Sequence, residues 1–243
     1  MTIHRTPTSA RALTAAIFDV DGVLLRSPHE QAWREALDGF ADPGRFTTAM
    51  YQAEVAGKPR LDGARAALEA LGAPDAEGRA QAYAECKQKR LEVLIKKGCV
   101  TAFPDALRFV QKLGSMGWRM AVASASKNAN QMMEPIRLGS GQALLDAFAA
   151  NVCGRDFRRG KPDPEIFLTA AEELGAAPDS CIVIEDAAAG VEAARAGGMT
   201  ALGLARLGDA DLLRAARADL VVTTLDEVDL DELVHGRLCT VAV

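Results

Sequence analysis

The segment Thr14-Ala15-Ala16-Ile17-Phe18-Asp19-Val20-Asp21-Gly22 decides the fold of this 243-residue chain. Its first five residues form a short, mainly apolar run, which is typical of a buried strand in a parallel sheet. Two carboxylates, Asp19 and Asp21, follow at once, and Gly22 lets the chain turn. The pattern predicts a strand that delivers two acidic side chains to one edge of a sheet.

Further short apolar runs alternate with longer amphipathic segments, and this alternation is typical of β-α-β units. We expect helices over 104–116 and 164–174, each with a proline near its start and a glycine after its end. The other expected strands are 119–123, 151–153, 181–184, 200–204 and 220–222. The sequence predicts an α/β fold in which a parallel sheet has helices on both faces.

One region breaks this alternation of strands and helices. Between Pro28 and Lys97 the sequence shows only helical periodicity, over 29–40, 43–56, 61–71 and 76–97, with glycine and proline breakers between the segments. We therefore expect an all-helical cap domain, residues 28–100, inserted into a catalytic core that comprises residues 1–27 and 101–243.

Chemically active side chains follow several of the predicted strands. Ligands of an open parallel sheet bind beyond the carboxyl ends of its strands, so residues at those ends are expected to lie together. Four acids repel one another there, and an oxygen-preferring Mg2+ ion relieves that repulsion. The residues that follow the strands are Asp19, Asp21, Ser124, Ser126, Lys161, Glu185 and Asp186. Together they predict a site that binds a phosphoryl group, in which the four acids hold Mg2+.

The same residues suit covalent phosphoryl transfer. Asp19 can attack phosphorus, which divides one difficult transfer into two easier ones. Asp21 can protonate the leaving oxygen and later take a proton from the attacking water or alcohol. Ser124 and Lys161 can hold the phosphoryl oxygens, where charge must be stabilised.

The order of these motifs resembles that of the haloacid dehalogenase superfamily and, within it, the β-phosphoglucomutase-like subfamily. With the cap, the resemblance covers nearly the whole chain. It implies a Rossmann-like core, Asp19 as nucleophile, and Asp21 as general acid/base that also offers its backbone carbonyl to Mg2+. It implies that Glu185 and Asp186 complete the metal site. The similar segments are 18–23, 123–128, 160–164 and 184–186.

Basic and polar residues near this edge are candidates for binding the rest of the substrate. Lys58 and Arg60 lie in a short loop between predicted helices, where similar mutases use an arginine to bind the distal phosphate. A guanidinium suits that role, but an exposed residue at a helix start also explains Arg60. Ser126, Lys127 and Asn128 follow the second motif, and they either contact substrate or simply begin a helix.

Other residues with chemical potential receive no role. Lys87 is explained at least as well by a charged helix surface. The three histidines, His4, His29 and His235, form no pair or cluster in the sequence. We therefore assign none of them to catalysis or to a metal.

Other classes of function fit less well. A calcium loop fails because Val23 and Leu24 stand where an oxygen ligand and a glycine are needed. In a receiver domain, which has similar residues, the acidic pair precedes the phospho-acceptor, whereas here it comes last. Asp21 argues against dehalogenation and phosphonate hydrolysis. A non-catalytic sugar-phosphate-binding protein on the same fold stays open.

We expect a phosphatase that acts on a small phosphorylated sugar or related metabolite. The alternative is a β-phosphoglucomutase, which interconverts β-glucose 1-phosphate and glucose 6-phosphate. Arg60 and the segment 126–128 favour a mutase-like site for a second phosphate. Gln31 argues against it, because a mutase is expected to have a histidine there that couples cap closure to acid/base action.

Composition and charge limit the partners and the location. The formal net charge of −5 offers no broad basic surface for nucleic acid. Five scattered cysteines lack metal spacing and indicate reduced thiols. Residues 1–13 lack the apolar run of a signal peptide, and no stretch has the length of a membrane span. We expect a cytoplasmic monomer, or alternatively a dimer, that binds a small phosphorylated metabolite and neither nucleic acid nor membrane.

Overall fold

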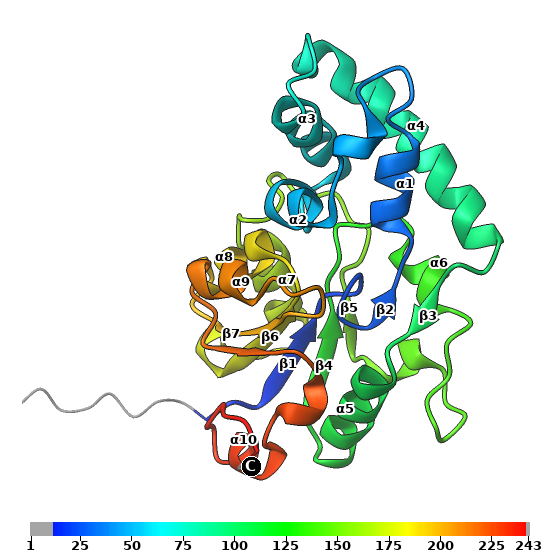
Figure 1. Cartoon of the computed structure of the whole chain (residues 1–243). Coiled ribbons are helices and arrows are strands. Elements are labelled where there is room, and N and C mark those ends of the chain that lie inside the picture. Colours follow the sequence, from blue (N-terminus) through cyan, green and yellow to red (C-terminus); the bar gives the residue numbers. More distant parts are fainter. Residues whose placement is uncertain (1–11, 242–243) are drawn as a thin grey trace, which may run out of the picture.

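A six-stranded parallel sheet forms the centre of the molecule (Figure 1). The computed structural model describes residues 12–241, so most of the segment 1–13, with His4, lies outside the described residues. The strand order is β5-β4-β1-β6-β7-β8. The strands are β1 (Ala15–Phe18), β4 (Arg119–Val122), β5 (Ala150–Asn151), β6 (Cys181–Glu185), β7 (Thr200–Leu204) and β8 (Leu220–Val222). The predicted α/β fold is confirmed.

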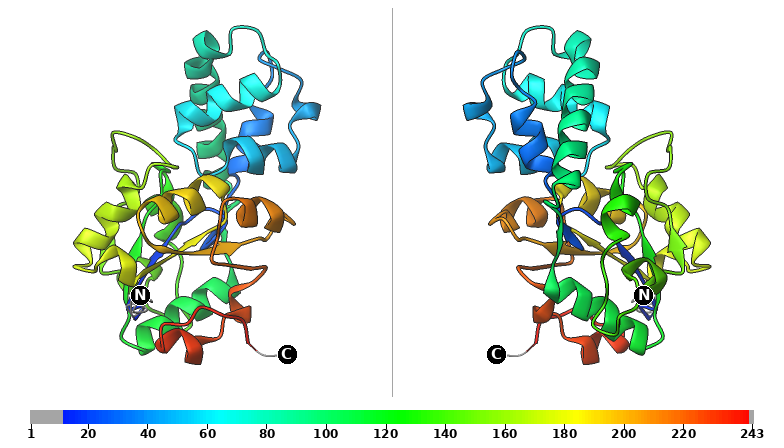
Figure 2. Two further views of the ribbon diagram at one scale, coloured as in Figure 1. Left: turned by 90° about the vertical axis from the view of Figure 1, so that its left-hand side faces the viewer. Right: turned by 90° about the vertical axis from the view of Figure 1, so that its right-hand side faces the viewer.

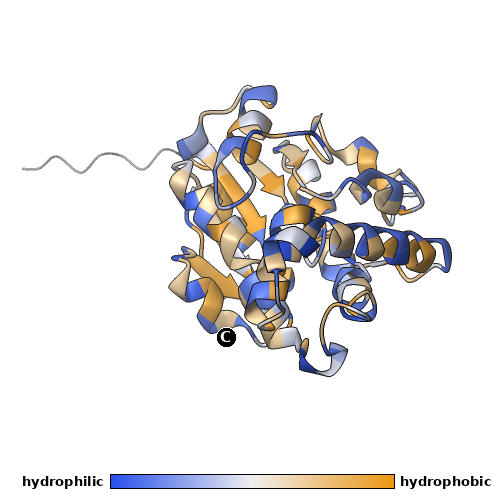
Figure 3. Ribbon diagram, turned by 90° about the horizontal axis from the view of Figure 1, so that it is seen from above, coloured by the Kyte–Doolittle hydropathy of each residue, from blue (hydrophilic) through white to orange (hydrophobic). Residues whose placement is uncertain are grey.

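Both faces of the sheet are buried, because successive side chains of each strand point to opposite sides. In β1, Ala16 and Phe18 join one hydrophobic core, whereas Ala15 and Ile17 join the other. The first core is covered by α5 (Pro104–Ser115), α6 (Ala129–Met133) and α10 (Leu230–Val234), and the second by α7 (Glu165–Glu173), α8 (Ala188–Ala196) and α9 (Ala210–Ala215). Figure 3 shows largely hydrophobic strands among helices of mixed hydropathy.

A separate group of helices lies beyond the carboxyl ends of the strands (Figures 1 and 2). It comprises α1 (His29–Glu35), α2 (Thr48–Met50), α3 (Arg60–Ala70) and α4 (Ala76–Lys96). These helices have a core of their own, which includes Trp33, Leu68 and Tyr83. The Tyr83 hydroxyl donates to the Trp33 carbonyl at 2.8 Å, which ties α4 to α1.

Two short strands join this helical group to the sheet. Leu25–Arg26 (β2) and Thr101–Ala102 (β3) pair antiparallel, next to the predicted cap boundaries. The sequence analysis missed them, because two residues show no periodicity. The described residues contain no helix that is both long and apolar enough to cross a membrane.

The predicted helix over 43–56 was wrong as one element. It consists of a 3-10 turn (η1, Pro43–Arg45), the short α2 and a π-helical segment (η2, Tyr51–Val55). Thr47 interrupts it, because its hydroxyl caps α2 by accepting from Met50 N. The wide π turn buries Gln52, and such turns recur at functional sites.

Candidate active site

Lys161 joins two of the predicted acids in the interior. Its Nζ donates to Asp19 Oδ1 at 2.5 Å and also to Glu185 Oε1. Asp19 follows β1, Glu185 ends β6, and all three side chains are buried. Burial raises the pKa of Asp19, and Lys161 opposes that rise. Burial alone lowers the pKa of Lys161, but the two carboxylates outweigh it and raise this pKa above its usual value. The ammonium therefore stays charged beside Asp19.

Asp21 lies on a tight turn against Asp186. Gly22 has φ +86°, and a Cβ there would lie 1.9 Å from Asp186 Oδ2, so only glycine allows this approach. Burial raises the pKa of Asp21, while Ser27 and Lys87 oppose the rise. A carboxyl with a raised pKa is better suited to give and take a proton than an ordinary aspartate.

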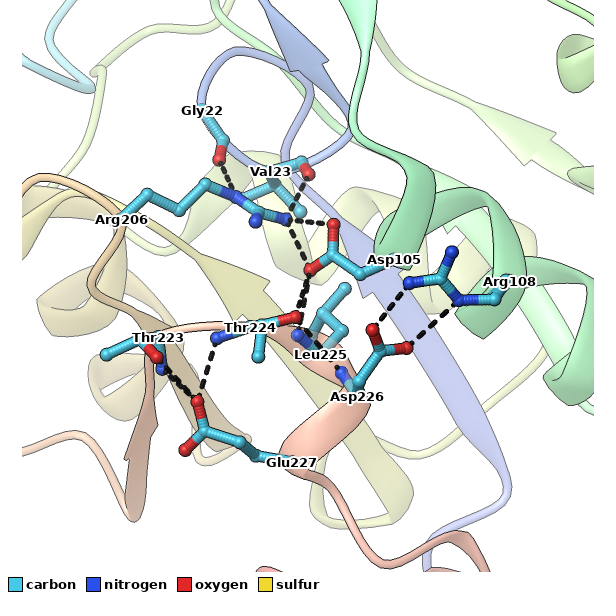
Figure 4. A network of polar contacts seen from close by, with 10 residues as sticks. All are labelled: Gly22, Val23, Asp105, Arg108, Arg206, Thr223, Thr224, Leu225, Asp226 and Glu227. Carbon is cyan, nitrogen blue, oxygen red and sulfur yellow. Dashed lines mark hydrogen bonds and ion pairs between the residues drawn. The ribbon is translucent and has the colours of Figure 1, made fainter.

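Arg206 binds the turn directly after Asp21, and Figure 4 shows its contacts with Gly22 and Val23 of that turn. Its Nε donates to Gly22 O at 3.0 Å and its Nη2 to Val23 O at 3.3 Å. The guanidinium also lies 3.8 Å from the centre of the Phe103 ring and pairs with Asp105. Asp105 in turn accepts from Thr224 Oγ1 and Leu225 N. No motif pointed to this network, whose members come from segments far apart in the sequence.

The four predicted metal residues do not form one ready-made ligand group. Among residues 12–241, no three His, Cys, Asp or Glu side chains are arranged to hold a metal ion. Both Glu185 oxygens have protein donors, Lys161 Nζ and Ala187 N. The expected metal role of Glu185 therefore stays a prediction, and in this structure its carboxylate is turned to Lys161.

The remaining oxygen donors nevertheless fit Mg2+. The Asp186 carboxylate has no hydrogen-bond or ion-pair partner among the described residues. Burial raises the pKa of Asp186 well above its usual value, and Glu185 and Asp19 add to the rise. Lys161 balances only part of the charge of four acids, so a cation with oxygen ligands is favoured. The carboxylates of Asp19 and Asp186 and the backbone carbonyl of Asp21 are the donors that suit it.

His29 lies between Asp21 and Lys87, which the sequence analysis did not foresee. Its Nε2 is 3.6 Å from Asp21 Oδ1 and 3.3 Å from Ser126 Oγ, and its Nδ1 is 2.9 Å from Lys87 Nζ. Burial, Lys87 and Arg60 together lower the pKa of His29 well below its usual value, so the imidazole is neutral. When Lys87 is protonated, its ammonium can only donate, so Nδ1 then accepts and Nε2 carries the proton.

Gln31 does not occupy the place that was expected for the histidine of a mutase. It is exposed and donates to Glu35 Oε1 at 2.8 Å, whereas His29, two residues earlier, faces the acids. A signal was present in Trp33, which lies one helical turn after His29 and lines the same cavity. The argument from Gln31 against a mutase therefore falls.

Lys87 is buried rather than on a charged surface. It is 2% exposed and lies over the Trp33 ring at 4.7 Å. Burial lowers its pKa to about 7, and Asp21 opposes this shift. Its position on the buried stripe of α4, with Tyr83 and Leu91 four residues to either side, was visible in the sequence.

The segment after β4 meets the helical group. Ser124 is buried, and its Oγ accepts from Ser126 N at 3.1 Å. Asn128 exchanges two hydrogen bonds with the Gln88 amide of α4, at 3.1 and 3.3 Å. Lys127 donates to Gly154 O and Asp156 Oδ1. Lys127 and Asn128 therefore already have protein partners.

These side chains line one cavity of about 720 Å3. Lys58 and Arg60 also line it, and neither side chain forms a hydrogen bond or ion pair with the described residues. Lys58 lies in the loop before α3, and Arg60 begins α3. This loop touches the core, since a Cβ on Gly160 would lie 1.9 Å from Pro59 Cγ. The cavity thus combines a buried carboxylate, Asp19, with two cationic side chains that have no partner among residues 12–241. Its lining includes Asp19, Asp21, His29, Ser124, Asn128 and Lys161.

Comparisons with known proteins find a matching family model and several similar proteins. Residues 13–198 match the model of the haloacid dehalogenase-like hydrolase family. The chain is 34% identical to a β-phosphoglucomutase of Mycobacterium bovis, over 88% of this chain and 90% of that protein. It is 30% identical to a phosphorylated carbohydrates phosphatase of Thermotoga maritima, over 77% and 82% respectively. The crystal structure of a Pyrococcus β-phosphoglucomutase superposes with a TM-score of 0.72 at 29% identity, covering 92% of this chain and 99% of that one.

Proposed function

The chain belongs to the haloacid dehalogenase-like hydrolase family, and on that premise we propose that it is a Mg2+-dependent phosphatase that acts on a small phosphorylated sugar through an aspartyl phosphate. One observation carries the proposal: Asp19 is buried at the edge of the cavity, is held by Lys161, and lies on the same short turn as Asp21. Relatives named as phosphatases and mutases of sugar phosphates support this substrate class.

In the first step, an oxygen of Asp19 attacks phosphorus and the bond to the sugar oxygen breaks. Asp21 gives its proton to that leaving oxygen. Lys161 and the Ser124 hydroxyl hold the phosphoryl oxygens, and Lys58 and Arg60 bind a distal anionic or hydroxyl group of the sugar. Asp19, Asp186 and the Asp21 carbonyl would hold Mg2+, which would supply positive charge to screen the acids and the phosphate.

In the second step, water attacks the aspartyl phosphate. Asp21 takes a proton from this water, and the carboxylate of Asp19 is restored. The neutral His29 lies beside Asp21 and links it to Lys87 of the helical group. Movement of that group therefore changes the surroundings of the acid/base.

A β-phosphoglucomutase is the second candidate, and the position of His29 favours it. In a mutase, a sugar hydroxyl replaces water in the second step. The contacts of His29 with Asp21 and Lys87 provide the coupling between helical group and acid/base that such a reaction is expected to need.

A paired assay separates the two candidates. Sugar phosphates are screened for phosphate release with Mg2+ present, and β-glucose 1-phosphate is also followed for conversion to glucose 6-phosphate. Phosphate release without isomerisation supports the phosphatase. Isomerisation much faster than phosphate release would show that the protein is a mutase and not a phosphatase. Asp19→Asn is the inactive control for both reactions.

A further inference from the structure

A second cavity reaches the same acids. It has a volume of about 350 Å3 and extends from Asp21 and Asp186 toward Ser27, Gln52 and the loop after β7. His29, Tyr51, Asp21 and Asp186 line both cavities. The two cavities therefore meet at the reacting groups, but Lys58 and Arg60 line only the larger one.

Two buried acceptors without partners line this second cavity. Gln52 is 5% exposed, and neither its Oε1 nor Asp21 Oδ1 has a hydrogen-bond partner among the described residues. Buried polar atoms almost always have a partner, so these two call for a donor from within the cavity. Asp21 Oδ1 also lies on the larger cavity, but Gln52 does not.

The chemistry of the walls selects a small neutral donor. Arg206 directs its Nε and Nη2 donors to Gly22, Val23 and Asp105. The cavity lining has four acids, against two cations that could attract an anion, Arg206 and Arg26, and the acids are Asp21, Glu30, Asp186 and Asp209. Glu30 likewise accepts from Thr48 and Arg34. Water satisfies unpaired acceptors in polar cavities, and at about 30 Å3 per molecule several fit in this volume.

We propose that the second cavity supplies the water that hydrolyses the aspartyl phosphate, from outside the substrate cavity. This inference rests on the proposed function. Gln52 Oε1 and Asp21 Oδ1 accept hydrogen bonds from the water. Its oxygen bonds to phosphorus as the bond from phosphorus to Asp19 breaks, the electron pair returns to the Asp19 carboxylate, and the proton passes to Asp21. Retention of a sugar in the larger cavity then does not stop hydrolysis.

The test separates phosphorylation from dephosphorylation in rapid-mixing kinetics with p-nitrophenyl phosphate and Mg2+. Gln52→Leu keeps the side-chain size but removes the acceptor. We expect an unchanged rate for the initial burst of p-nitrophenol and a steady-state rate about three- to tenfold lower, the worth of one hydrogen bond. Leu207→Trp, at an exposed position on the wall of the second cavity, narrows it and is expected to act in the same direction. Gln111→Leu on α5, which lines neither cavity, is the matched control.

The outcomes distinguish this inference from the proposed function. If both cavity variants match Gln111→Leu in burst and steady state, the second cavity does not supply the water, although the phosphatase stands. If the wild-type protein forms no phosphoenzyme, the proposed function itself fails. The burst also shows that each variant is folded and can be phosphorylated.

Discussion

Arg206 Nε donates a hydrogen bond to the carbonyl oxygen of Gly22 at 3.0 Å. This bond ties the loop after β7 to the turn that carries Asp21, although the two residues are 184 positions apart. Figure 4 shows that the same guanidinium reaches Asp105, which in turn accepts from the segment after β8. The position of Asp21, the proposed acid/base, thus depends on contacts between distant parts of the core.

Replacement of Arg206 by methionine is expected to lower kcat by up to about a hundredfold with little change in KM, because Asp21 loses its position. It also leaves Asp105 buried without its cation, which costs about 3 kcal/mol of unfolding free energy. Steady-state kinetics and urea unfolding measure the two effects. Arg108→Met, which breaks the exposed pair with Asp226 beside this network, is the control and costs no more than about 1 kcal/mol. Equal kinetics in the two variants would refute a positioning role.

Gly160→Ala is expected to lower kcat/KM by pushing away the loop that carries Arg60. The new Cβ would meet Pro59 Cγ at 1.9 Å and Cδ at 2.4 Å. Pro59→Ala removes both of these atoms, so the double variant recovers most of the loss. From the kcat/KM values of the two single variants and the double variant, we expect a coupling free energy of about 1–2 kcal/mol between the two substitutions. Additive effects of the two substitutions on kcat/KM would show that the contact between Gly160 and Pro59 does not position the loop.

Lys87→Met is expected to stabilise the protein more at pH 6 than at pH 9. The pKa of Lys87 is about 7 in the folded protein and near 10.5 in a free lysine. Below about pH 7 both states are protonated, and the folded state bears the full cost of a buried charge. That cost is relieved as pH rises from about 7 toward 10.5, where the unfolded chain binds more protons.

Urea unfolding at the two pH values measures the stability of Lys87→Met against wild type. Groups that face Lys87, namely His29, Asp21 and Arg60, are left unchanged. Lys89→Met, at an exposed position on the same helix, is the control. A stabilisation that does not vary with pH would contradict a lowered pKa for Lys87.

Mg2+ is expected to raise the melting temperature of the wild-type protein, because it binds the folded acids and not the unfolded chain. At a Mg2+ concentration a hundred times its Kd, the free energy of unfolding rises by about 2.7 kcal/mol. Asp186→Asn removes a ligand and a buried charge, so this variant is more stable than wild type without Mg2+ and gains little from it. Asp211→Asn, at a 99% exposed side chain, behaves as wild type. Thermal melts with and without MgCl2 measure these shifts, and an equal Mg2+ effect in Asp186→Asn would remove Asp186 from the metal site.

The strands and the edge of the sheet where the acids gather could be predicted from the sequence. Residues buried on both faces form continuous apolar runs, and the end of each run marks where Asp19, Ser124 and Glu185 stand. Such local patterns need no knowledge of tertiary structure.

His29, Lys87 and Arg206 were misjudged or missed because their roles depend on contacts between distant segments. The path of the chain between Asp21 and α1 decides whether residue 29 or residue 31 faces the acid, and β2 on this path pairs with β3 from a distant part of the sequence. Arg206 has its partners far away in the sequence, so no spacing could indicate them. Gln52 was hidden because a π turn changes which side chains of a helical segment face inward.

The central claim is that Asp19 forms a covalent bond to phosphorus, and acid quenching during turnover tests it most directly. The protein is mixed with substrate and Mg2+, quenched in acid, digested and examined by mass spectrometry. We predict one added phosphoryl group on the peptide that contains Asp19, absent from Asp19→Asn, which is also inactive. Full phosphate release by Asp19→Asn, or a phosphoryl group on a different residue during turnover, would contradict the covalent mechanism.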